Sequence, residues 1–335
     1  MRPLGKIFTL AAAAVCFVAA AARAQDAYPA RLVTLIVPFA AGGPTDVVAR
    51  LVAEHMSKTL GQQIVIENVI GAGGTTSAVR AMRSPPDGYT IMMGHMGTHA
   101  AAVAHYPNLP YDPATDFEPI GMVAGMPVLM LVKKDAPARD LAAFVELARR
   151  ETGKLKMAHA GNGSISYTTC QLFNSLIGAK PALVAFQGTA PAMSALVAGR
   201  VDYMCDQSVS VVPEAQAGRV RVLVVGTQQR NPVLPDVPTA REAGLPEFQA
   251  SAWNALFAPK HTPRPVIASL NAALGRALDD PYVRSRLLAL GSEIPDAADR
   301  TPDALAKLVQ REIAKWTAVK SSNSLELRGG EREKP

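Results

Sequence analysis

Two glycine-rich segments of this chain have the residue types and spacing that hold a small anion. In the first, Phe39-Ala40-Ala41-Gly42-Gly43 follows a mostly apolar run at 32–37 and precedes Pro44-Thr45-Asp46. The apolar run predicts a buried strand, and proline with an acidic residue favours the first turn of a helix. Unpaired backbone N–H groups and the positive end of the helix dipole then face the space above the strand. This geometry binds an anion without any charged side chain.

The second segment repeats this arrangement between a predicted strand at 155–158 and a predicted helix at 167–177. It reads Gly161-Asn162-Gly163-Ser164-Ile165-Ser166. The glycines let a ligand approach the backbone, and Ser164 or Ser166 can add a hydroxyl donor. An ordinary serine N-cap between flanking glycines is the alternative interpretation. We expect the two turns to face each other and to share one anion.

Other polar side chains also follow predicted strands. The polar set comprises Thr98, Ser164, Gln187, Thr189 and Asp206. Because open α/β sheets bind ligands beyond the carboxyl ends of their strands, we expect these residues to line one cleft. A bare carboxylate repels an anion, so Asp46 is expected to stabilise its own helix N-terminus. Asp206 is expected either to be structural or to hold a water, a hydroxyl or an ammonium group of the ligand.

Two patterns that suggest a cofactor are incomplete. The segment Gly71-Ala72-Gly73-Gly74-Thr75-Thr76 has threonine where a dinucleotide fingerprint requires its last glycine, so we expect a tight turn into a helix. His95 and His99 have the spacing of a helical metal pair, but no third ligand is evident. Capping or surface positions are expected for both histidines. The sequence therefore predicts no cofactor, no metal and no catalytic residue.

The N-terminus is typical of a secretory signal peptide at residues 1–24. Arg2 and Lys6 form a positive region, an apolar run follows at 7–22, and a small-residue cleavage motif ends at Ala24. An uncleaved membrane anchor is the alternative, but the apolar run is short for one. We expect a soluble, exported mature chain located in the periplasm.

The amino-acid composition limits the classes of molecule that the protein is expected to bind. The chain has 34 Lys and Arg against 28 Asp and Glu, and its aromatic content is 5%. This weak positive surplus suits a protein that meets small anions, and the lack of a basic block with interleaved aromatics argues against nucleic acid. The mature chain keeps Cys170 and Cys205, which in an oxidising compartment either form one disulfide or remain as buried thiols.

The length of the chain predicts two α/β lobes. A proline-punctuated loop leads to two β-like runs at 119–124 and 128–132, where we expect the chain to change lobe. Three amphipathic helices, at 263–278, 281–290 and 302–317, are expected to cover the first lobe. The expected boundaries are 25–125 with 247–320 for lobe 1, 126–246 for lobe 2, and 321–335 for a polar tail.

Short motifs stand in a specific order along nearly the whole mature chain. They are Pro38-Phe39-Ala40-Ala41-Gly42-Gly43 with Asp46, Gly71-Ala72-Gly73-Gly74, Asp87-Gly88-Tyr89, Leu109-Pro110-Tyr111-Asp112, Gly161-Asn162-Gly163-Ser164, Gln187-Gly188-Thr189-Ala190-Pro191-Ala192, Ala217-Gly218-Arg219 and Leu234-Pro235-Asp236-Val237-Pro238-Thr239. In this order the chain resembles the exported solute-binding receptors of tripartite tricarboxylate transporters, known in Bordetella as Bug proteins.

The resemblance implies a type II periplasmic binding protein fold, with two α/β lobes that close on a ligand cleft. It also implies that two strand-to-helix turns grip a carboxylate of an organic acid. The candidate ligand-binding residues are then Phe39, Ala41, Gly42, Gly43, Thr45, Asp46, Gly74, Thr98, Asn162, Gly163, Ser164, Ser166, Gln187, Gly188, Thr189 and Asp206. The expected partners are a small carboxylate and membrane permease subunits, and the chain is expected to be a monomer.

The sequence departs from the family beside the expected cleft. The departing segments are Tyr167-Thr168-Thr169-Cys170 and Tyr203-Met204-Cys205. Their proximity makes Cys170–Cys205 the disulfide worth testing.

Two other functions stay open. An exported hydrolase would use Ser164, although the G-x-S-x-G elbow is missing. A ligand sensor would present its closed form to a membrane signalling partner, and the sequence does not separate it from a transport receptor.

Overall fold

A computed structural model of the protein describes residues 28–330, so the predicted signal peptide lies outside the described residues. Within them the strands form one mixed sheet in the order β2-β1-β3-β9-β4-β7-β5-β6, and β8 pairs with β4. The strands are β1 (Val33–Pro38), β2 (Ile64–Val69), β3 (Thr90–His95), β4 (Phe117–Lys133), β5 (Lys156–His159), β6 (Ala182–Ala185), β7 (Tyr203–Gln207), β8 (Val220–Val225) and β9 (Ser251–Pro259).

The helices alternate with these strands, as in an α/β protein. They are α2 (Pro44–Leu60), α3 (Thr75–Met82), α4 (Ala102–His105), α5 (Leu141–Arg150), α6 (Ile165–Ile177), α7 (Thr189–Val197), α8 (Ser208–Gln216), α9 (Arg264–Asp279), α10 (Pro281–Ala289) and α11 (Pro302–Gly330). Three short helical turns complete the set, η1 (Ala72–Gly74), η2 (Gly97–Ala101) and η3 (Ala297–Arg300).

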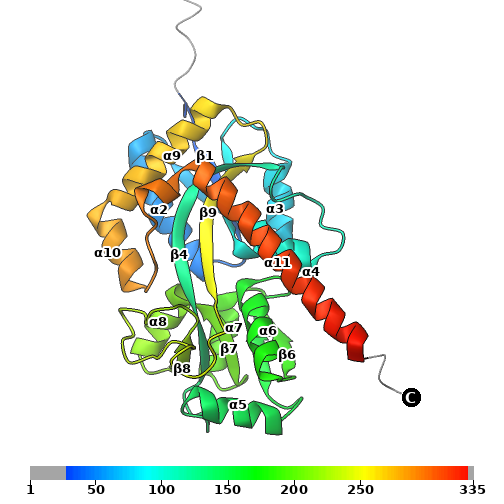
Figure 1. The fold of residues 1–335 in the computed structure, drawn as a ribbon. Coiled ribbons are helices and arrows are strands. Elements are labelled where there is room, and N and C mark those ends of the chain that lie inside the picture. Colours follow the sequence, from blue (N-terminus) through cyan, green and yellow to red (C-terminus); the bar gives the residue numbers. More distant parts are fainter. Residues whose placement is uncertain (1–27, 331–335) are drawn as a thin grey trace, which may run out of the picture.

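The first lobe surrounds β1, β2 and β3. β1 is parallel to both β2 and β3, and β3 runs antiparallel to β9. Leu35, Ile36 and Val37 of β1 are fully buried, as expected for a parallel strand covered on both faces. Helices α2, α3 and α9 lie around this part of the sheet, in the upper half of Figure 1. The apolar run that predicts a strand at 32–37 therefore forms the centre of this lobe.

The second lobe surrounds β5, β6 and β7 and carries helices α5 to α8, in the lower half of Figure 1. β5 is parallel to β6 and β7, whereas the C-terminal half of β4 is antiparallel to β7 and β8. Phe144, Phe173 and Tyr203 are among its largest fully buried side chains. These side chains belong to one apolar cluster that continues into the first lobe, and a second cluster, which includes Leu196 and Val211, lies within the second lobe alone.

The long strands β4 and β9 run through both lobes (Figure 1). β4 pairs with β9 as far as Pro127 and then with β7 from Val128 onward. The sequence predicts two separate β-like runs here, and that prediction is wrong. Gly125 does not interrupt the strand, because its N–H and carbonyl exchange hydrogen bonds with Glu293. One continuous strand thus carries the chain from lobe to lobe.

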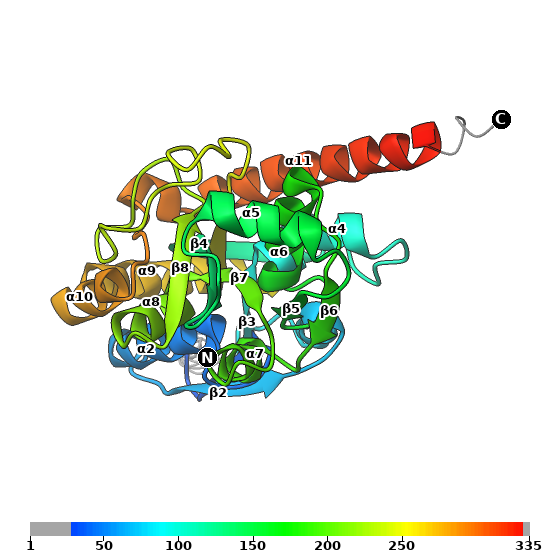
Figure 2. The ribbon, with the colours of Figure 1, turned by 90° about the horizontal axis from the view of Figure 1, so that it is seen from below.

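Helix α11 is longer than the sequence predicts. It spans Pro302–Gly330, whereas the predicted helix ends at residue 317. Figure 2 shows that its C-terminal part extends away from the body of the protein. In the part of the chain that the structure describes, no helix has both the length and the hydropathy required to cross a membrane.

Candidate functional site

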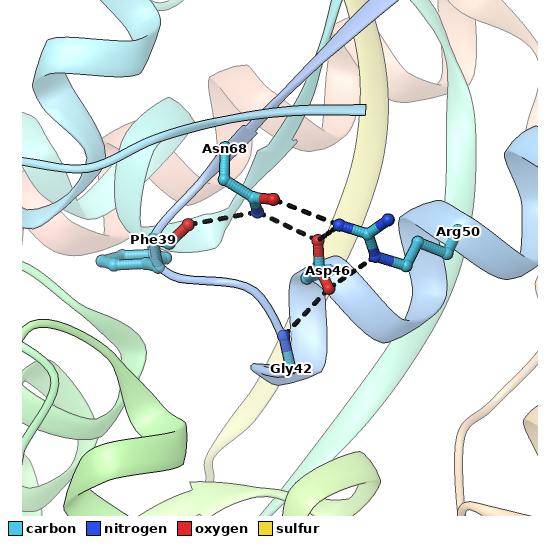
Figure 3. A network of polar contacts seen from close by, with 5 residues as sticks. All are labelled: Phe39, Gly42, Asp46, Arg50 and Asn68. Atoms are coloured by element: carbon cyan, nitrogen blue, oxygen red, sulfur yellow. Dashed lines mark hydrogen bonds and ion pairs between the residues drawn. The ribbon is translucent and has the colours of Figure 1, made fainter. Parts of the chain in front are cut away.

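The first turn, residues 39–46, connects β1 to α2 and is held by Asp46 (Figure 3). Asp46 Oδ2 accepts hydrogen bonds from the Gly42 N–H at 2.9 Å and from Arg50 Nε at 2.8 Å. Asp46 Oδ1 accepts from Asn68 Nδ2 at 2.9 Å and from Arg50 Nη2 at 3.0 Å. The carboxylate thus fixes both the turn and the edge of β2. Sequence reasoning missed Arg50, although its i,i+4 spacing from Asp46 could have indicated the pair.

These contacts also set the charge of the first turn. Burial raises the pKa of Asp46, but the hydrogen bonds from Arg50, Gly42 and Asn68 outweigh it and hold the pKa below its usual value. The carboxylate is therefore ionised and paired. Because Asp46 already engages the Gly42 N–H, the N–H groups that helix geometry leaves for a ligand are those at the start of α2, of Thr45 and Asp46.

Phe39 adopts a backbone conformation that is rare for a bulky residue. Its φ is +71°, in the left-handed region. Its ring stacks on His95 with 5.4 Å between ring centroids. Such strained positions are concentrated at ligand clamps and switch regions, so Phe39 is a natural candidate for contact with a ligand.

The second turn, residues 161–166, connects β5 to α6. Ser164 is the N-cap, and its Oγ accepts the Tyr167 N–H at 3.2 Å. Ser166 Oγ accepts the Ala160 N–H at 3.0 Å and lies 3.2 Å from Ser164 Oγ. The alternative interpretation of Ser164 as an N-cap therefore holds. The N–H groups of Ile165 and Ser166 have no helical acceptor at this end of α6.

A disulfide lies behind the second turn. It joins Cys170 of α6 to Cys205 of β7, with 5.2 Å between their Cα atoms. Both residues are fully buried. The helix that presents the second turn is therefore covalently fixed to the sheet of its own lobe.

The two turns form the walls of one small cavity. Its lining residues are Pro38, Phe39, Ala40, Gly43, Pro44, Thr45, Asp46, Ala160, Ser164, Ile165, Ser166, Thr189 and Gln207. The cavity measures about 10 Å³. That is close to the room which one water molecule needs. The sequence analysis does not predict Gln207 as a site residue, because its only sequence signal is its place at the end of a strand.

The structure separates several other candidates from this cavity. Asn162 and Gln187 line a neighbouring cavity of about 430 Å³, which Phe39 also borders. Gly42 borders a third cavity with Thr189. The remaining candidates, Ala41, Gly74, Thr98, Gly163, Gly188 and Asp206, line none of these three cavities.

Thr98 is engaged inside the first lobe. Its Oγ1 hydrogen bonds with the backbone of His95 and with His99 Nδ1. Thr98 is fully buried, and a Cβ at Gly74 would lie only 2.7 Å from its methyl group. Thr98 is expected to line the cleft, but the structure buries its hydroxyl inside the η2 turn, where His95 and His99 engage it.

His95 and His99 are buried and not on the surface. The capping interpretation holds for His95, because its Nδ1 accepts the Gly97 N–H at 2.8 Å. His99 instead stacks on Phe257, with 3.8 Å between ring centroids. Among the described residues, no cluster of His, Cys, Asp or Glu could hold a metal.

Asp206 reaches the small cavity only through a neighbour. Burial raises its pKa to about 7, while hydrogen bonds from the Gln207 N–H and the Thr189 hydroxyl partly offset this effect. Its Oδ2 is buried and has no hydrogen-bond partner within the part of the chain that the structure describes. Thr189, which lines the cavity, is thus a neighbour of the buried Asp206 carboxyl.

Tyr106 connects the two lobes beside the site. Its hydroxyl lies 2.8 Å from the Ala72 carbonyl oxygen and 2.7 Å from the Asn162 carbonyl oxygen. A Cβ at Gly73 would overlap Asn162, and one at Gly163 would lie 2.9 Å from the Tyr106 ring. The glycines thus permit a close approach of the lobes. No sequence signal marks Tyr106.

The protein has two α/β lobes joined by shared strands, and helix N-termini of both lobes surround one cavity. This arrangement defines the class of periplasmic binding proteins. Comparison with known families then places the chain within it. The family model described as "Tripartite tricarboxylate transporter family receptor" matches residues 48–325, and the chain belongs to this family.

Solved structures agree with this assignment. MatC of Rhodopseudomonas palustris, solved with bound malate, is 53% identical, with a TM-score of 0.86 over 88% of this chain and 100% of that chain. The periplasmic binding protein BugD is 37% identical, with a TM-score of 0.85 over 88% and 98%. R. palustris Rpa4515, solved with adipate, is 35% identical, with a TM-score of 0.84 over 88% and 97%.

The family settles the class of activity. Its members are solute-binding receptors of the periplasm and not enzymes, so the chain is a receptor and the hydrolase alternative fails. The geometry agrees, because the side-chain hydroxyl of Ser164 contacts Ser166 and Tyr167 and no histidine among the described residues.

Proposed function

We propose that this receptor captures a small organic acid in the periplasm by holding one carboxylate between the first and second turns. The observation that carries the proposal is the cavity walled by both turns, one from each lobe. MatC binds malate and Rpa4515 binds adipate, which supports a carboxylate as the ligand. The helix N-termini supply N–H donors and a favourable dipole for a negative group.

The ligand enters when the lobes separate. A cavity of about 10 Å³ is far smaller than a four-carbon acid. The close contact through Tyr106 corresponds to a closed arrangement. In a dry cleft, charge-assisted hydrogen bonds each contribute about 1.5–3 kcal/mol, and micromolar affinity requires about 8 kcal/mol. A few such bonds from the two turns suffice.

We further propose that the lobes move as units bounded at residues 25–125 with 247–320 and at residues 126–246. Membrane permease subunits of a tripartite transporter would receive the closed form, as the family's description suggests. A sensor that presents the same closed form to a signalling partner uses the same site, and assay with membranes that carry the permease separates the two roles.

A thermal-shift screen tests the site. Mature protein is heated with malate, adipate and matched acids, and with the corresponding amides as uncharged controls. A true ligand at 100 times its dissociation constant adds about 2.7 kcal/mol of stability. We expect the acids, and not the amides, to raise the unfolding temperature. Equal shifts with acids and amides, or no shift with any acid, would contradict the proposal.

A further inference from the structure

Two buried polar side chains lie next to each other at the floor of the first lobe. His95 of β3 and Asn254 of β9 are directly paired across antiparallel strands. Paired residues project from the same face of a sheet with their Cβ atoms about 5 Å apart. Both residues are 0% exposed, and His95 Nε2, Asn254 Nδ2 and Asn254 Oδ1 have no hydrogen-bond partner among the described residues.

The contacts of His95 fix which nitrogen carries its proton. The Gly97 N–H donates to Nδ1 at 2.8 Å, so Nδ1 is the acceptor and Nε2 carries the hydrogen. Burial lowers the pKa of His95 to about 3, and the ring is neutral at physiological pH. Together His95 and Asn254 offer N–H donors and one amide oxygen, without a formal charge.

His95 of this pair lies where the two lobes meet. A Cβ at Gly97 would lie 2.5 Å from His95 Cε1 and 2.8 Å from the Gly163 carbonyl oxygen. The second turn therefore approaches the edge of the imidazole. On its face, the His95 ring is stacked on Phe39, which lines the cavity between the turns. The Phe39 ring thus lies between the His95 imidazole and the cavity.

Leaving these groups unpaired costs stability. A buried polar group without a partner costs about 1–3 kcal/mol, and an apolar side chain of similar shape avoids that cost. The buried amide of Asn254 therefore carries a desolvation cost that an apolar side chain of similar shape would avoid. Such a cost is offset when a ligand supplies the missing hydrogen-bond partner.

We propose that His95 and Asn254 form a second subsite, which binds the far carboxylate of a dicarboxylic acid after the Phe39 ring moves aside. This inference rests on the proposed function, in which the two turns hold the near carboxylate. The neutral donors complement the second carboxylate without needing a cation in the floor of the cleft. The structure thereby selects dicarboxylates over monocarboxylates of equal chain length.

The test compares Asn254→Leu with the wild-type protein on matched acids. Isothermal titration calorimetry measures succinate, malate and adipate against butyrate and hexanoate. We expect Asn254→Leu to weaken dicarboxylate binding at least tenfold and to change monocarboxylate binding less than twofold. Its unfolding temperature without ligand should stay equal or rise, which a merely structural asparagine would not produce.

His99→Leu is the matched control. His99 Nε2 is also buried and unpartnered, but the ring lies between Phe257 and Phe117 inside the first lobe. We expect this variant to keep the wild-type ratio of dicarboxylate to monocarboxylate affinity.

Three outcomes would overturn the subsite. One is an unchanged affinity ratio in Asn254→Leu together with a lower unfolding temperature, which would make Asn254 a packing residue. Another is wild-type protein that binds butyrate as tightly as succinate and hexanoate as tightly as adipate, which would remove the subsite and leave the proposed function standing. Failure of every acid to bind wild-type protein would overturn the proposed function as well.

Discussion

The first and second turns present similar backbone geometry, but different chemistry holds each in place. Asp46, Arg50 and Asn68 fix the first turn through an ion pair and hydrogen bonds. Serine hydroxyls fix the second turn, and the Cys170–Cys205 disulfide holds the helix behind it. Neither anchoring set leaves a net charge at the cavity. In the proposed function, attraction for an anion therefore rests on helix N-termini in both lobes, while each turn is held in place by contacts within its own lobe.

The largest expected difference in stability between the anchors of the two turns comes from the disulfide. Its loss removes a constraint on the unfolded chain across a sequence separation of 35 residues. For a loop of that size the loss is about 4 kcal/mol in the chain-entropy treatment. We expect reduction, or the double change Cys170→Ala with Cys205→Ala, to lower the free energy of unfolding in urea by up to this amount. An oxidised and a reduced protein of equal stability would show that the second turn needs no covalent anchor.

The next largest effect on stability is expected at Asp46, which anchors the first turn. Asp46→Ala removes the acceptor for Gly42, Arg50 and Asn68, and we expect a loss of about 2 kcal/mol, since Arg50 remains half exposed to solvent. Urea denaturation measures it, with Asp46→Asn as the isosteric control that keeps part of the network. A loss below about 0.5 kcal/mol would contradict the anchoring role.

A third prediction uses pH to separate Asp206 from Asp46. The pKa of Asp206 is raised to about 7 from its ordinary 3.8. The folded state therefore binds the proton more tightly than the unfolded state, so this contribution stabilises the protein below pH 3.8 and is lost as pH rises to about 7. Asp206→Asn should abolish the decline of stability across that interval, measured by urea midpoints.

The contribution of Asp46 to stability depends on pH in the opposite direction. Its pKa is lowered, so its contribution is present above pH 3.8 and is lost as pH falls through the folded-state pKa. Asp46→Asn should flatten only this acid side of the profile. A profile that is unchanged in both variants would contradict the assignment.

Capping gives a smaller effect in the second turn. Ser164→Ala removes the side-chain acceptor of the Tyr167 N–H, and we expect a loss of about 1 kcal/mol in thermal or urea unfolding. Ligand binding should weaken as well, since Ser164 lines the cavity. Unchanged binding and stability would show that the hydroxyl contributes to neither.

The smallest effect on stability is expected at the corresponding position of the first turn. Gly43 is the N-cap of α2 and has no side-chain cap. Its φ of −75° accepts serine, and a Cβ there would meet the Ala40 carbonyl oxygen only at 3.5 Å. Gly43→Ser should change stability by a few tenths of a kcal/mol. Because the new side chain points toward Thr189 across the cavity, we expect the thermal shift with carboxylates to disappear; a wild-type shift would place the ligand elsewhere.

Local signals explain which parts of the fold could be predicted. The start of α2 at Pro44 and the Ser164 cap follow from the types of neighbouring residues, and the structure agrees with both. The continuity of β4 could not be predicted, because Gly125 and Pro127 read locally as a break. Pairing with Glu293 and with Ser251 of β9 overrides that local signal.

The sequence did not predict the roles of Asn254 and Tyr106 for the same reason. Asn254 lies in an apolar run, and only the register of β3 with β9 places it beside His95. Tyr106 gains its significance from Ala72 and Asn162, which are 34 and 56 residues away in sequence. Sequence patterns report contacts along one element, whereas these contacts arise where separate elements meet.

The Tyr106 hydroxyl has one proton and two carbonyl oxygens within reach. Closing the cleft therefore exchanges one acceptor for another and does not add a full bond. The lobes can come together with almost no enthalpic reward of their own at this point, so the occupant of the cleft decides how long they stay together. In the proposed function, the bound acid therefore supplies the interactions that keep the lobes closed beside Tyr106.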